Sequence, residues 1–143
     1  MMLRIDHQVR VFVFQVLDRG IEYLLLRQRP TVEWPFGPVI GTIRPEEHVR
    51  DTVLREVQEE TGIERPVHLI DLVVPQKELF GDIGLVEWPF AYQAGAPSSP
   101  LAQVKPGPTV GDFAWMSFPK AFEEVGSDRD REALVRLQVQ LQG

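Results

Sequence analysis

A single helical turn that carries three glutamates constrains this chain more than any other feature of its sequence. Val49, Val53 and Val57 recur at intervals of four residues, which predicts an amphipathic helix over residues 49–61. Gly62 follows the last periodic position, where helices commonly end. On this helix three acidic side chains share an arc of roughly 100° within about one turn; they are Glu56, Glu59 and Glu60.

This arrangement of charges is unfavourable for a helix that serves only as scaffold. Glu56 and Glu60 are a like-charged i,i+4 pair, and the last turn of a helix favours cations over anions. At about 6 Å and an effective dielectric constant near 20, two partly buried carboxylates repel by roughly 3 kcal/mol. Arg55 neutralises one charge at most. A divalent cation would compensate the rest, and ligands that are all oxygen favour Mg²⁺ or Mn²⁺ over Zn²⁺.

The spacing around the helix decides between a metal site and a solvated acidic face, which is what glutamates on a helix usually form. Five, seven, one and one residues separate the successive groups Gly41, Glu47, Arg55-Glu56-Val57, Glu59-Glu60 and Gly62-Ile63. This pattern matches the Nudix box at every defined position, and a chance match is on the order of one in a billion per starting position. Residues 34–63 therefore resemble a Nudix hydrolase.

The resemblance implies a metal site built on this helix. One or more Mg²⁺ or Mn²⁺ ions would be bound by Glu56, Glu59, Glu60 and a backbone carbonyl at Gly41 or at the residue before it. The family usually carries Pro-Gly-Gly just before or at the box glycine, whereas residues 37–41 read Gly-Pro-Val-Ile-Gly. Because a carbonyl ligand does not depend on the identity of the side chain, the metal site is expected despite this departure.

The same resemblance implies catalytic roles. Arg55 would hold the neighbouring carboxylates in place, and Glu47 would support the site from the loop before the helix. The attacking water would lose its proton either to Glu56 or to an acid outside the box, for which Asp112 and Glu87 are the candidates. The expected catalytic residues are Arg55, Glu56 and Glu59.

Candidate substrate contacts lie both before and after the box. Arg27 and Arg29 lie at the end of a predicted strand and just after it, and they would either contact phosphate or remain surface charges. Trp34 and Phe36 would either stack on a base or pack in the core, as aromatic residues of a small domain more often do. The full set of expected substrate contacts is Arg27, Trp34, Phe36, Glu87 and Asp112.

The remaining periodicity predicts strands before and after the helix. Strands over 8–17 and 21–28 form a hairpin around Asp18-Arg19-Gly20, and an irregular connection follows. A continuous apolar run predicts a well-buried strand over 67–74. Another strand covers 84–93, where Pro89 indicates an edge or a bulge.

The C-terminal third begins with an irregular stretch. Residues 94–111 predict a substrate loop or a disordered segment because four prolines and three glycines interrupt them. A short strand over 112–117, a helix over 119–125 and a final helix over 128–141 follow, the last opened by Ser127 with Asp130. These elements predict one α+β domain over 1–143, and the resemblance implies an α/β/α sandwich around a mixed sheet.

Composition narrows the class of partner. A net charge of −6 argues against binding of a nucleic-acid polymer, although a bound metal still permits a phosphorylated small molecule such as a nucleotide. Without cysteine the chain has neither disulfides nor thiol catalysis. No apolar run approaches a membrane span or a secretory h-region. We therefore expect a cytoplasmic protein, a monomer or a homodimer, that does not bind membranes.

The expected function is metal-dependent hydrolysis of a diphosphate linkage, with a nucleoside triphosphate as the expected substrate and a nucleoside monophosphate plus pyrophosphate as products. ADP-ribose, sugar nucleotides and dinucleoside polyphosphates remain alternative substrates. Two further alternatives are a Nudix-fold module that binds a nucleotide without cleaving it and a protein-interaction domain whose acidic helix is a solvated face.

Overall fold

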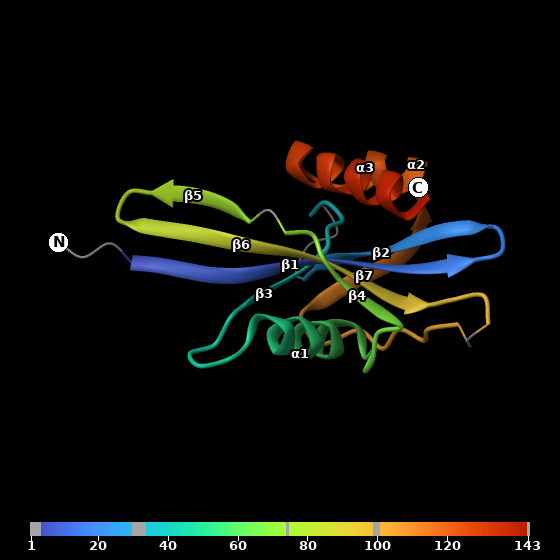
Figure 1. Ribbon diagram of the computed structural model, residues 1–143, viewed down its shortest axis with the longest axis horizontal. Helices are drawn as coiled ribbons and strands as arrows, with labels where there is room; N and C mark the ends of the chain where they lie inside the picture. The colour runs from blue at the N-terminus through green and yellow to red at the C-terminus, as the bar shows by residue number, and fades with distance from the viewer. Residues whose placement is uncertain (1–3, 30–33, 74, 99–100, 143) are drawn as a thin grey trace.

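A mixed sheet lies between helices on its two faces in the computed structural model, which describes residues 4–29, 34–73, 75–98 and 101–142 (Figure 1). Helix α1 covers one face, and helices α2 and α3 cover the other, which confirms the expected α/β/α sandwich. The elements in chain order are β1 (Arg4–Leu17), β2 (Gly20–Gln28), β3 (Val39–Thr42), α1 (Val49–Thr61), β4 (His68–Asp71), β5 (Gln76–Phe80), β6 (Ile83–Gly95), β7 (Val110–Ser117), α2 (Phe118–Glu124) and α3 (Asp128–Gln142).

The sheet is organised around strand β1. Its main path runs β4-β6-β1-β2-β7, with β3 added to β1 and β5 added to β6. The pairing of β1 with β6 is parallel and the other pairings are antiparallel. The alternation of side chains along β1 fills two cores: Val9 and Val11 pack on the α1 face, and Phe12 and Phe14 pack on the α3 face.

The helices reach these cores through the periodic positions that the sequence indicates. Val53 and Val57 of α1 are fully buried against the first core, and Leu134 and Leu137 of α3 are fully buried against the second. The Ser127 hydroxyl accepts a hydrogen bond from the Asp130 amide at 3.2 Å and so caps α3, as expected. No helix of the described ranges is long and apolar enough to cross a membrane.

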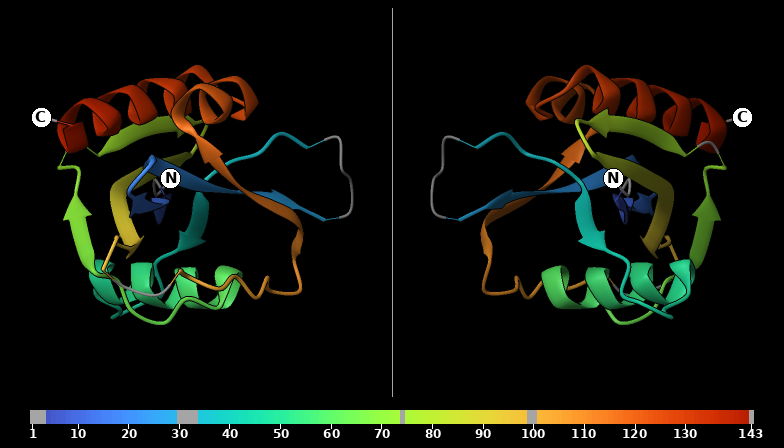
Figure 2. Two further views of the ribbon diagram at one scale, coloured as in Figure 1. Left: turned by 90° about the vertical axis from the view of Figure 1, so that its right-hand side faces the viewer. Right: turned by 90° about the vertical axis from the view of Figure 1, so that its left-hand side faces the viewer.

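The sheet is split where β1 changes its antiparallel partner. Residues 8–11 of β1 pair with β3, whereas residues 13–17 pair with β2. Beyond this point β2 continues with β7 as its neighbour, and Figure 2 shows the end of β2 and the start of β7 extending to one side of β3. The segment before β3 crosses the split, where Gly37 forms a two-way backbone bridge with Leu26. A cavity lies at this split, and its lining includes Glu60 of α1 on one face and Asp130 of α3 on the other.

Three features of the other edge differ from the sequence prediction. Strand β4 is only partly buried because it lies at the edge and pairs with β6 alone, so the prediction of a well-buried strand over 67–74 is wrong; Val74 lies outside the described residues. Strand β5 was not predicted. Pro89 lies inside the sheet rather than at its edge. Strand β6 tolerates it because the outer partner of β6 changes there: β5 pairs with β6 as far as Glu87, and β4 pairs with it from Phe90 onward.

The irregular stretch after β6 packs against the end of α1. The Lys105 amide donates to the Thr61 carbonyl at 2.8 Å, and the Gly107 amide donates to the Glu60 carbonyl at 3.1 Å. Ala102 and Val104 also contact the first core. The part of this stretch that the structure describes is therefore an ordered cap for the last carbonyls of the helix.

Candidate metal and substrate site

Helix α1 presents the three predicted glutamates in its second half. The helix spans the predicted residues and ends at Gly62, whose φ of 76° lies in the left-handed region. Glu56 is buried, Glu59 is 51% exposed, and Glu60 is intermediate. Thr109, in the segment that caps the helix, donates its hydroxyl to the Glu60 carboxylate at 3.2 Å. The three side chains thus lie on one face of the helix, and their exposure to solvent increases from Glu56 through Glu60 to Glu59.

Arg55 joins the acidic residues of the box. Its Nε and Nη2 lie 2.8 and 2.9 Å from the two carboxylate oxygens of Glu47, and its Nη1 lies 2.7 Å from Glu56 Oε1 and 3.4 Å from Glu59 Oε2. Its Nη2 also donates to the Thr42 carbonyl of β3 at 3.0 Å. One guanidinium therefore contacts three carboxylates while it supplies only one positive charge.

The environments of Glu47 and Glu56 shift their pKa values in opposite directions. Hydrogen bonds from Arg55 and Thr52 lower the pKa of Glu47 to about 2. Burial raises the pKa of Glu56, the charges of Glu59 and Glu60 add to this, and Arg55 opposes it. Glu47 is thus a stable anion that holds Arg55, whereas burial disfavours the charged form of Glu56.

Gly41 lets the Glu56 carboxylate lie directly against strand β3. A Cβ atom at residue 41 would stand 2.1 Å from Glu56 Cδ and 2.5 Å from Glu56 Oε1, well inside van der Waals contact. Any side chain at this position would therefore displace the carboxylate. The glycine of the box is explained by this close approach, which also brings the β3 backbone beside the buried carboxylate.

The donor set fits a hard divalent cation in its chemistry. It consists of carboxylate oxygens, one of them buried with a raised pKa, beside the backbone of β3. Within the described part of the chain no three acidic side chains yet converge on a common point. Arg55 Nη1 contacts both Glu56 and Glu59, so a cation would have to share or replace this bridge.

The predicted substrate contacts fall into separate groups. Arg27 lies 4.1 Å above the ring of Phe36 and 3.9 Å from Asp112 Oδ2, so these three residues form one cluster at the split in the sheet. Phe36 is mainly a core residue, 7% exposed, whereas Trp34 is 55% exposed. Glu87 lies apart from this cluster: it is buried on the α3 face and pairs with Arg10 and Arg129. No hydrogen bond or ion pair between described residues joins Asp112 or Glu87 to the three box glutamates.

A cavity of about 380 Å³ connects the box to the split in the sheet. We name it the box-side cavity; its wall includes Phe36, Ile40, Glu60, Ser127, Arg10 and Asp130. Arg10 and Asp130 were missed in the sequence analysis. Arg10 carries a signal that could have revealed it, because it is the one charged residue in the otherwise apolar run from Val9 to Phe14.

Comparisons with known proteins agree with this geometry. A family model described as the NUDIX domain matches residues 6–137. The structure is similar to a Listeria monocytogenes protein described as a NUDIX hydrolase, at 22% identity, a TM-score of 0.77 and coverage of 95% of this chain and 94% of that chain. A search of curated proteins finds no match.

Two further solved structures share the fold. One is the dihydroneopterin triphosphate pyrophosphohydrolase of E. coli, at 19% identity and a TM-score of 0.72, with 94% of this chain and 95% of that chain covered. The other is the NUDIX domain of Shewanella oneidensis NrtR in complex with ADP ribose, at 17% identity and a TM-score of 0.73, with 99% and 90% covered. At these identities the likeness concerns the fold.

Proposed function

The chain belongs to the NUDIX family, and from that premise we propose that it is a Mg²⁺- or Mn²⁺-dependent hydrolase that cleaves a nucleoside triphosphate into a nucleoside monophosphate and pyrophosphate. The observation that carries the proposal is the buried Glu56 carboxylate, pressed against Gly41 and raised in pKa beside Glu59 and Glu60. A carboxylate held in this state is stabilised when a cation binds, so binding and ionisation support each other.

The acidic residues of the box and Arg55 each have a part in this proposal. Glu56, Glu59 and Glu60 would hold the cation, and Glu47 would fix Arg55 so that the helix and β3 keep their spacing. When bound, the cation would neutralise the phosphate oxygens and lower the pKa of a coordinated water. Attack by the water oxygen forms a new P–O bond and breaks the anhydride P–O bond. The water's proton passes to a carboxylate, for which Glu56 is the candidate inside the box.

The box-side cavity offers a place for the nucleoside. It begins at Glu60 on the α1 side and reaches Ser127 at the start of α3, with Phe36 in its wall. Its volume of about 380 Å³ lies near the lower end of the range of small-molecule sites, about 300–1,000 Å³. One nucleoside fits such a space better than a larger two-part group, which favours a triphosphate over a dinucleoside polyphosphate.

The name of the E. coli structure, a triphosphate pyrophosphohydrolase, also supports a triphosphate substrate. The complex of the NrtR domain with ADP ribose supports the alternative of a nucleotide-sugar substrate or of a module that binds without cleaving. The full set of box acids favours cleavage over binding alone.

A substrate panel tests the proposal. With Mg²⁺ we expect turnover of at least one nucleoside triphosphate to the monophosphate and pyrophosphate, identified by mass, in preference to ADP-ribose, sugar nucleotides and dinucleoside polyphosphates. Glu59→Gln removes the negative charge of one proposed ligand of the cation and should lower kcat by about 10²-fold. The fold should change little, because the side chain is half exposed. If wild type and Glu59→Gln are equally inert on the whole panel, the hydrolase assignment is wrong.

A further inference from the structure

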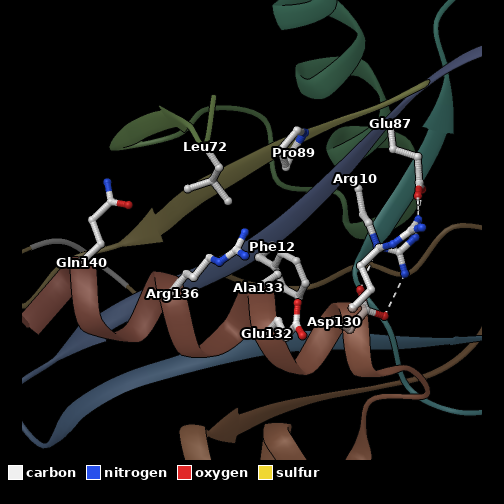
Figure 3. A pocket seen from close by; sticks show the side chains of 11 residues that line it. Arg10, Phe12, Leu72, Glu87, Pro89, Asp130, Glu132, Ala133, Arg136 and Gln140 are labelled. Atoms are coloured by element: carbon white, nitrogen blue, oxygen red, sulfur yellow. Dashed lines mark hydrogen bonds and ion pairs between the residues drawn. The ribbon is translucent and has the colours of Figure 1, made fainter. Parts of the chain in front are cut away.

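The box-side cavity ends at a wall that it shares with a second cavity. The second cavity, which we name the helix-side cavity, has a volume of about 450 Å³ and lies between β1, β6 and α3 (Figure 3). Phe12, Leu72, Pro89 and Ala133 supply its apolar lining. Two residues line both cavities; they are Arg10 of β1 and Asp130 of α3.

The wall that the two cavities share is a bidentate ion pair between Arg10 and Asp130. Arg10 Nε lies 2.7 Å from Asp130 Oδ1, and Arg10 Nη2 lies 2.8 Å from Asp130 Oδ2. Arg10 Nη1 also lies 3.1 Å from Glu87 Oε2. Figure 3 shows Arg10 between Asp130 and Glu87 at one end of the helix-side cavity. An arginine held by paired N–H bonds to a carboxylate has a fixed orientation, so this wall is stiff.

Burial makes the wall costly to open. Asp130 and Glu87 are each 3% exposed, and Arg129 and Gln8 hold Glu87 from its other sides. Moving Arg10 aside would leave a buried carboxylate without its partner, which is strongly unfavourable in a protein interior. A ligand in the box-side cavity therefore meets a closed end, although an apolar space of similar volume lies behind it.

We propose that the Arg10–Asp130 ion pair sets the upper size limit of the group that this enzyme accepts next to the diphosphate. This inference rests on the proposed function. A nucleoside in the box-side cavity stops at the ion pair, and a nucleotide with a bulky substituent on the far side of its base is rejected. Arg10 and Asp130 are thus specificity-determining residues that contact the end of the ligand. Their ion pair does not involve the box glutamates.

The test compares two substrates in a variant that lacks the wall. The substrates are a triphosphate that the wild type hydrolyses and the same nucleotide with a benzyl group on its base. The double variant Arg10→Ala/Asp130→Ala removes both charges of the pair, and Glu87 keeps Arg129 as its counter-ion. We expect kcat/KM for the benzylated substrate to rise at least tenfold relative to the parent, mainly through a lower KM.

A filled helix-side cavity provides the matched control. Ala133→Phe places a ring in that cavity, so in the double variant it should abolish the gain, and in the wild type it should leave hydrolysis of the parent substrate unchanged. If Ala133→Phe alone lowers kcat/KM for the parent substrate by more than about threefold, the substrate already occupies the helix-side cavity, and the proposal is overturned. The proposal is also overturned if the folded double variant has the same ratio of kcat/KM for the benzylated substrate to kcat/KM for the parent as the wild type.

Two precautions keep the outcomes distinct. If the double variant does not fold, Arg10→Gln/Asp130→Asn weakens the same wall while it keeps its hydrogen-bonding groups, and the same change in ratio is expected. A wild type that hydrolyses no triphosphate contradicts the proposed function itself. In that case calorimetry on the wild type and the double variant gives the dissociation constants of the two nucleotides. Binding of the benzylated nucleotide should improve at least tenfold relative to the parent in the double variant, and an unchanged ratio would overturn the size limit.

Discussion

Replacing Glu56 by glutamine is expected to lower kcat by about 10³-fold, which corresponds to about 4 kcal/mol of lost transition-state stabilisation. Glutamine keeps the shape of the side chain and removes the charge that the cation requires. Glu56 is the buried carboxylate of the three and the one that lies against β3, so an exposed neighbour cannot take its place. Steady-state kinetics with Mg²⁺ on the substrate identified by the panel measure the effect.

The same substitution should not destabilise the metal-free protein at neutral pH. The pKa of Glu56 is raised in the folded state, chiefly by burial, so ionisation of this group opposes folding once the pH exceeds its unfolded pKa. Glu56→Gln removes that cost, and its Tm without metal should equal or exceed that of the wild type at pH 7. The advantage should vanish on acidification, where the glutamate is protonated in both states. Full activity, or a large loss of Tm without metal, would contradict this account of Glu56.

Replacing Gly41 by alanine is expected to lower kcat by about 10²-fold although no carboxylate is removed. The new Cβ would lie 2.1 Å from Glu56 Cδ and 2.2 Å from Glu56 Cγ. The chain is expected to relieve the clash by moving the Glu56 side chain, because this costs less than distorting strand β3. The displaced carboxylate would then bind the cation poorly, since small errors in the position of a ligand cost activity steeply. Activity and the dissociation constant for Mn²⁺ should therefore worsen together.

Gly84→Ala is the matched control for this substitution. Gly84 lies in strand β6, and a Cβ there would meet Ile5 Cγ1 at 3.6 Å, an ordinary contact. The control should leave activity unchanged. If Gly41→Ala retains wild-type activity as well, Glu56 does not need its place against β3, and the proposed metal site is wrong.

The sequence predicted the elements that rest on strong periodicity and local stop signals. Helix α1 and its end at Gly62 match the valine spacing, and the hairpin of β1 and β2 and the cap of α3 at Ser127 are also confirmed. The burial of the strand at 67–74 was predicted wrongly because an apolar run does not show whether its strand lies at an edge. Strand β5 has a mixed sequence, QKELF, without a strong period, and it forms through its pairing with β6.

The site was predictable as a set of residues and only partly as an arrangement. The spacing of the box predicts the acidic residues and Arg55. The contact of Arg55 with three carboxylates, however, depends on the distance between α1 and the loop that carries Glu47. Arg10 and Asp130 come from opposite ends of the chain and meet only because α3 packs across β1. Such long-range ion pairs leave little local signal beyond a charged residue in an apolar run.

A crystal soaked in Mn²⁺ tests the central claim most directly, because manganese is located by its anomalous scattering. The account predicts one or more anomalous peaks within about 2.1 Å of a carboxylate oxygen of Glu56 and of at least one oxygen from Glu59 or Glu60. A map with no peak on this face of α1, and with Arg55 still bridging Glu56 and Glu59, would contradict it.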